Sequence, residues 1–158
     1  MSRAHSEELE RIKQEYLNAK RGLSTLAQTL QNMQPSRQRY YSGFSNVRHQ
    51  LLEAAVITAN DAYALLLIAK AEGFLRNYLM SLNPPIRIGN EPKLSSLIDK
   101  SYKAFNCSNP RIPIKVEHKV EFHDLRIQRN NYAHGNSCSF PSVERVATTL
   151  GRFFDQLP

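Results

Sequence analysis

The chain has 158 residues, 41% hydrophobic and 22% charged, which is enough to bury the core of one domain with an extension but leaves little room for two domains. Its 21 Lys and Arg residues against 14 Asp and Glu give a formal charge of +7, which suits a polyanionic partner such as RNA and equally an ordinary basic protein. Cys107 and Cys138 lie far apart without a CxxC pattern, so we expect reduced thiols in a cytoplasmic protein rather than disulfides or a zinc site.

Residues 1–36 are predicted to form a long amphipathic helix. Apolar residues recur in steps of three and four, the seam spacing of a coiled coil, and Pro35 ends the pattern. They are Leu9, Ile12, Tyr16, Ala19, Leu23, Leu26, Leu30 and Met33. Gly22 is a flaw that costs roughly 1 kcal/mol relative to Ala in a helix interior. So narrow a stripe calls for one facing helix, which belongs either to the same domain or to a dimerisation or binding partner.

Two further helices are predicted at residues 42–59 and 62–82, separated by Asn60-Asp61, where Asp offers a new N-cap. The second is the most apolar and belongs in the centre of the bundle. Its apolar run, Ala62 to Ala69, is well below the roughly 20 residues that cross a bilayer, so no membrane segment is expected. The N-terminus lacks an apolar stretch behind a basic start, which argues against a secretory signal. Pro84-Pro85 begins a loop.

Three more predicted helices complete an all-α fold, divided into an N-terminal helix at 1–36 and a helical domain at 37–158. They occupy residues 93–105, residues 114–134, and a last segment that starts at Ser142. Gly135 should cap the second of these in a left-handed conformation. The last helix is expected to face inward with Val143, Val146, Ala147, Leu150, Phe153 and Phe154.

Arg129 and His134 lie near the end of the predicted 114–134 helix and carry the functional prediction. Imidazole can give or take a proton near neutral pH, whereas guanidinium stays charged and matches phosphate geometry. RNA cleavage by its own 2′-hydroxyl needs a base, an acid and positive charge at the phosphate. Because five residues turn an ideal helix by about 140°, either the helix loosens at its end or a second copy completes the site.

Residues 129–134, Arg-Asn-Asn-Tyr-Ala-His, resemble the motif of HEPN-superfamily ribonucleases, an Arg, four to six residues and a His, with a polar residue directly after the Arg. Upstream, residues 71–79 look like the acidic, leucine-rich segment of an earlier HEPN helix. The resemblance covers roughly Tyr40 to the C-terminus. It implies a HEPN-like helical bundle, preceded here by the coiled-coil-like helix, that acts on RNA as a homodimer without a metal and leaves 2′,3′-cyclic phosphate ends. It also implies a toxin or phage-defence effector with an antitoxin or other regulatory protein partner.

The resemblance also implies roles for single residues. His134 would be the general acid and base, and Arg129 would hold the scissile phosphate and stabilise its developing charge. Asn130 matches the polar position and would orient the phosphate or the Arg. Tyr132 would either stack on a base or pack within the protein. Glu72 would pair with Arg129 or Arg126, or with the neighbouring Arg76 on its own helix.

Other interpretations stay open. Arg129 and His134 could be a surface cation and a helix cap, and the domain could be a non-catalytic HEPN-like dimerisation or RNA- and nucleotide-binding module. A helical scaffold is a third possibility. His118, His123 and Asp124 invite a metal site, but the two His lie five positions apart instead of the four positions that align ligands on one helical face. No glycine-rich phosphate loop is present in the sequence, so a nucleotide hydrolase is not expected, and the prediction includes no metal and no cofactor.

Overall fold

The computed structural model describes residues 2–32, 42–90, 92–135, 140–155 and 157, and these contain helices and no strands. The helices are α1 (Ser2–Asn32), α2 (Ser42–Ser81), α3 (Leu94–Ser108), α4 (Val116–Ala133) and α5 (Val143–Phe154). The prediction of an all-α fold is therefore confirmed. That the bundle is of HEPN type stays a prediction.

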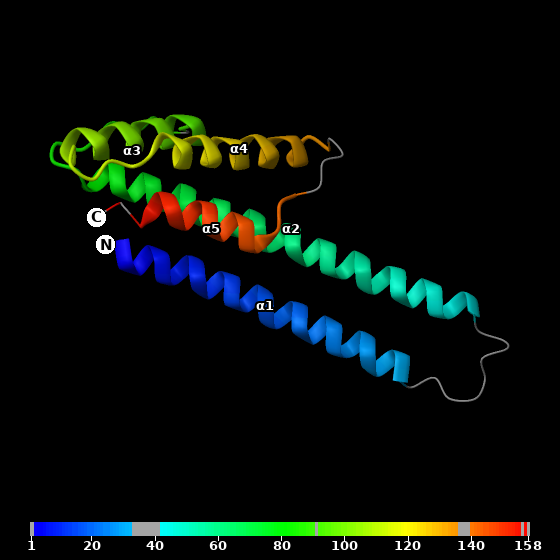
Figure 1. Ribbon diagram of the computed structural model, residues 1–158. Coiled ribbons are helices and arrows are strands. Elements are labelled where there is room, and N and C mark those ends of the chain that lie inside the picture. The colour runs from blue at the N-terminus through cyan, green and yellow to red at the C-terminus, as the bar shows by residue number, and fades with distance from the viewer. Residues whose placement is uncertain (1, 33–41, 91, 136–139, 156, 158) are drawn as a thin grey trace.

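The two longest helices, α1 and α2, run antiparallel to each other (Figure 1). The helix α5 packs against α1, α2 and α4, and α3 packs against α2 and α4. At one end of the molecule, α1 and α2 extend past the other three helices, whereas the chain termini lie at the other end (Figure 1). The bundle therefore covers only part of each long helix.

All five helices contribute to the core, and aromatic rings from α2, α4 and α5 fill part of it. Phe122 contacts Phe153 edge-on with ring centroids 5.2 Å apart, and Phe74 meets Phe154 in the same way at 5.9 Å. The predicted inward face of the last helix is confirmed, because its members are buried apart from one half-buried alanine. They are Val143, Val146, Ala147, Leu150, Phe153 and Phe154.

The first half of α1 packs on its own chain. Leu9, Ile12 and Tyr16 are buried in the common core, and the Tyr16 ring lies 5.8 Å from that of Tyr63 on α2. Beyond them Ala19 and Leu23 are half-buried, and Leu26 is exposed with 49% of its surface accessible. The predicted boundary at residue 36, with Met33 and Pro35, lies outside the described residues.

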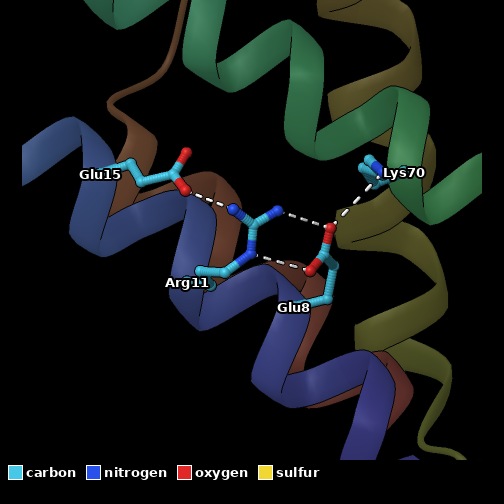
Figure 2. Close-up of polar contacts among 4 residues, drawn as sticks. All are labelled: Glu8, Arg11, Glu15 and Lys70. Carbon is cyan, nitrogen blue, oxygen red and sulfur yellow. Dashed lines mark hydrogen bonds and ion pairs between the residues drawn. The ribbon is translucent and has the colours of Figure 1, made fainter.

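Charged residues reinforce this contact between α1 and α2. Figure 2 shows Glu8 of α1 between Arg11 on its own helix and Lys70 on α2. The Lys70 ammonium lies 3.5 Å from a Glu8 carboxylate oxygen, and Arg11 also contacts Glu15. All of these side chains are partly exposed, so the network adds little to stability. Its main effect is to align α1 along α2.

The predicted break at Asn60-Asp61 is wrong, because α2 runs through both residues without interruption. Asn and Asp disfavour helix interiors when their side chains bond to nearby backbone, but here both side chains are engaged by other helices. The unbroken helix contains one stretch, Gln50–Ser81, that is long and apolar enough to cross a membrane, with a mean hydropathy of 1.6. Buried core helices meet the same criterion. The expectation of no membrane segment rested on the short uncharged run from Ala62 to Ala69, whereas the criterion of length and composition is met by the longer stretch.

Candidate functional site

The motif residues lie at the C-terminal end of α4. This helix turns Phe122 and Leu125 into the core, which fixes its rotation about its own axis. Its last turn closes with hydrogen bonds from the His134 amide to the Asn130 carbonyl at 3.0 Å and from the Gly135 amide to the Tyr132 carbonyl at 3.0 Å. Gly135 adopts a φ of 71°, which confirms the predicted left-handed residue, and the helix ends at Ala133 with His134 as its C-cap.

Arg129 is held by a carboxylate from another helix. Its Nη1 lies 3.5 Å from Oε2 of Glu72 on α2, and the other Glu72 oxygen accepts from Arg76 at 2.6 Å. The interhelical partner and the local partner predicted for Glu72 are therefore both present. The Glu72 side chain is 19% exposed and that of Arg129 is 37% exposed, so the guanidinium keeps a solvent-facing side while one edge is fixed.

His134 is exposed, and among the described residues no hydrogen bond or ion pair involves its ring. Arg129 contacts Glu72 instead of His134, so one protomer does not bring the two motif side chains into contact. Asn130 is also exposed and engages His134 only through its backbone carbonyl. The helix therefore presents a free imidazole at its end and an anchored guanidinium one turn earlier.

Tyr132 is the motif residue most engaged with its surroundings. Its ring meets the buried Phe140 edge-on, with centroids 5.4 Å apart. Its hydroxyl donates to the carboxylate of Asp61 on α2, and this hydrogen bond, with the negative charge behind it, raises the pKa of the phenol above its ordinary value. These contacts favour the packing interpretation, although 38% of the residue remains accessible.

Asn60 and Asp61, adjacent on α2, hold both sides of the segment that follows the motif. Asp61 binds Tyr132 before the segment. After it, the Asn60 side chain accepts from the Val143 amide at 3.0 Å and donates to the Pro141 carbonyl at 3.3 Å. Sequence reasoning missed this function. The available signal was two adjacent polar residues inside the most apolar helix, which was interpreted as a break instead of a contact.

The alternative metal residues are dispersed. His123 lies 3.2 Å from Asp99 on α3, which also pairs with Lys119 at 2.7 Å. Burial opposes ionisation of Asp99, but hydrogen bonds from Lys119 and His123 hold its pKa below the ordinary value. Within the described part of the chain, no three His, Cys, Asp or Glu residues are grouped to bind a metal. Asp124 lines a different feature, a groove of about 320 Å³ between α4 and α5 that also contains Glu121 and Arg152.

The arrangement can offer phosphate binding at Arg129 and proton transfer at His134, but from different sides of one helix end. Cleavage of RNA by its own 2′-hydroxyl needs one group that takes the proton of that hydroxyl and another that gives a proton to the departing 5′-oxygen, and the motif supplies one titratable group in each chain. A complete site of this chemistry therefore calls for the motif of a second copy.

Comparison with known family models, with curated proteins and with solved structures finds no match to this chain.

Proposed function

We propose that the chain is a metal-independent endoribonuclease of HEPN type that works as a homodimer with a composite Arg and His site. The observation that carries this proposal is the ion pair between Glu72 and Arg129 next to an exposed His134. It joins the two segments on which the family resemblance rests, residues 71–79 and 129–134. A carboxylate that holds a guanidinium by one edge leaves its other donors free for phosphate.

In the proposed mechanism the two copies of His134 have different roles in one cleavage event, one as the base and the other as the acid. Neutral His134 of one protomer takes the proton of the 2′-hydroxyl as its oxygen attacks the phosphorus. The bond from phosphorus to the 5′-oxygen breaks, and protonated His134 of the partner gives that oxygen a proton. Arg129 stabilises the charge on the non-bridging oxygens, and the products end in 2′,3′-cyclic phosphate and a 5′-hydroxyl. Asn130 would orient the phosphate, and Tyr132 would limit how the motif end moves.

The biological setting is proposed from the family alone: a cytoplasmic toxin or phage-defence effector under the control of an antitoxin-like protein. Uncontrolled RNA cleavage would harm the host, so a restraining partner is expected. The exposed second half of α1, marked by Leu26, is a candidate contact for it. Deleting the whole of α1 would expose the core around Ile12, so Leu26→Glu is the better test of partner binding.

The deciding experiment is cleavage of end-labelled RNA by the purified protein in EDTA, with His134→Ala and Arg129→Ala prepared identically. Cleavage with cyclic phosphate ends that both substitutions abolish is the expected result. His123→Ala, on the same helix but bound to Asp99, should cleave normally and serves as the matched control. Absence of cleavage from a folded dimer that still binds RNA would favour the alternative, a non-catalytic HEPN-like binding module.

A further inference from the structure

One face of α2 carries a stripe of uncharged residues, interrupted at Arg76, that the bundle leaves exposed or half-buried. We call it the α2 stripe; its members recur mostly in steps of three and four along the side opposite the core. They are Leu51, Ala55, Thr58, Ala62, Leu66, Ala69, Gly73 and Met80. Leu51 is 64% exposed, Leu66 is 40% exposed and Met80 is 60% exposed. The most apolar window of this helix is only 17% buried, so its apolar character is not explained by its own fold.

Contacts within the protomer do not explain why the stripe contains a glycine at position 73. A Cβ built on Gly73 would meet nothing within 4 Å, so packing inside the protomer does not require its small size. Glycine in a helix interior nevertheless costs about 1 kcal/mol relative to alanine. Ala62 and Ala69 are also small and exposed. Such residues let another helix backbone approach closely.

The order of the residues identifies the occupant. Reversed end to end about its middle, between residues 65 and 66, the stripe nearly matches itself. Ala62 then falls on Ala69, and Thr58 falls on Gly73. At the ends, Leu51 falls on Met80, so these three pairs set large against large and small against small. The other two members fall on residues outside the stripe, Ala55 on Arg76 and Leu66 on Leu65. A surface that complements its own reversed copy is what a two-fold symmetric dimer needs. We infer that α2 pairs antiparallel with α2 of a second copy, about a two-fold axis near Leu66.

Charge and area agree with this occupant. None of the eight stripe residues is charged, and Arg76 at the edge of the same face falls on Ala55 of the reversed copy. Two chains of formal charge +7 can therefore meet there without direct like-charge contacts. Arg76, beside the stripe, has its guanidinium turned to Glu72 at 2.6 Å. From Leu51 to Met80 the helix rises about 45 Å at 1.5 Å per residue. A strip of that length and about 10 Å width gives roughly half of the ~800 Å² per partner of a standard interface, and the flanking side chains add to it.

The pairing has a consequence for the motif, and this step rests on the proposed function. Asp61 and Glu72, which bind α4, each directly precede a stripe residue, so both lie on the same flank of α2. A two-fold axis perpendicular to an antiparallel helix pair keeps corresponding flanks on the same side. The two α4 helices would therefore lie on one side of the dimer. Each Glu72 would sit about 10 Å along α2 from the axis, so the two copies of Arg129 and His134 could share one cleft.

The pairing can be tested by introducing a charge into the stripe, then adding the opposite charge at the facing position, and measuring the dimer by sedimentation equilibrium. Ala69→Glu places a carboxylate against apolar Ala62 of the other copy at two symmetric positions and should weaken dimerisation about 100-fold or more. Adding Ala62→Lys to the same chain should restore the dimer, because each new lysine then faces a new glutamate. A parallel pair would instead set lysine against lysine, and the double variant would stay monomeric. Helical circular dichroism should be unchanged in every variant.

Cysteine pairing gives an independent readout. In a Cys107→Ser and Cys138→Ser background, Ala62→Cys protein mixed with Ala69→Cys protein should form a disulfide, whereas each alone should form far less. Ile127→Glu, at an exposed position on α4 away from the stripe, is the matched control and should leave the dimer intact.

Four results would overturn the inference: a wild-type monomer at about 100 μM, a dimer that survives Ala69→Glu, a dimer lost with Ile127→Glu, or a double variant that stays monomeric. A monomer that binds anionic vesicles through the stripe would overturn it in favour of a membrane contact. These results do not depend on catalysis. A dimer with the expected pairing and no RNA cleavage would refute the proposed function alone, and RNA cleavage by a dimer built elsewhere would refute this inference alone.

Discussion

Glu72 on α2 and Arg129 on α4 lie 57 positions apart in the chain, and their side chains meet with Oε2 and Nη1 3.5 Å apart. The contact fixes one edge of the guanidinium and ties the motif helix α4 to α2. Because Glu72 also binds Arg76, a single half-buried carboxylate is shared by two cations. Its charge is therefore better compensated than in either pair alone.

Glu72→Gln removes this charge while keeping the shape of the side chain. We expect RNA cleavage to fall by about tenfold or more, because Arg129 loses its anchor, and unfolding free energy in urea to fall by no more than about 1 kcal/mol. Glu121→Gln is the matched control, since Glu121 pairs with the exposed Arg152 away from the motif. Equal losses of cleavage in both variants would contradict a positioning role for Glu72.

Asp61→Asn should lower the pKa of Tyr132, because the hydrogen bond to a carboxylate is the main cause of its elevation. The raised pKa favours the neutral phenol in the folded state. Its contribution to stability is therefore complete below the unfolded value near 10 and is lost as pH rises through the folded pKa. Ultraviolet difference titration of tyrosinate checks this, with Tyr132→Phe to identify the signal. A Tyr132 titration that Asp61→Asn leaves unchanged would exclude the contact.

Asn60→Ala should destabilise the fold by about 1 to 3 kcal/mol, because it leaves the Val143 amide and the Pro141 carbonyl without their partner. Urea denaturation measures this loss. Ser142→Ala removes a local cap of the same helix, where the hydroxyl accepts from the Arg145 amide at 3.3 Å, and should cost less. If Ser142→Ala cost more than Asn60→Ala, the long-range contact would not be the main anchor of α5.

The sequence predicted the elements whose signals are local. Steps of three and four located α3 and α5 and the inward face of α5, and Gly135 located the end of α4 because few other residues adopt a left-handed cap without strain. Where a polar pair served contacts more than 70 positions away, as Asn60 does with Val143, the same local logic gave a false break. Propensity does not distinguish a side chain that competes with its own helix from one that caps another.

The candidate site was predictable to a similar degree. Both partners of Glu72 were foreseen, since one lies four residues along its helix and the other follows from the family pattern. The contact between Tyr132 and Asp61 was not, because nothing in either segment indicates their distance in space. The separation of Arg129 and His134 followed from the helical turn alone, since five residues cannot return a side chain to the same face.

Gly135→Ala tests how the helix end presents His134. A Cβ at Gly135 would meet nothing within 4 Å, so the cost should be the backbone strain of a φ near 71°, about 1 kcal/mol by thermal denaturation. Gly135→Asn should cost less, because asparagine tolerates this conformation better. Gly22→Ala, in the interior of α1 with equally open space, is the control, because it should change stability in the opposite direction. It should stabilise the protein by up to about 1 kcal/mol.

If the left-handed cap positions His134 for catalysis, RNA cleavage should fall in Gly135→Ala and stay unchanged in Gly22→Ala. Full cleavage by a measurably destabilised Gly135→Ala protein would mean that the imidazole does not depend on this cap.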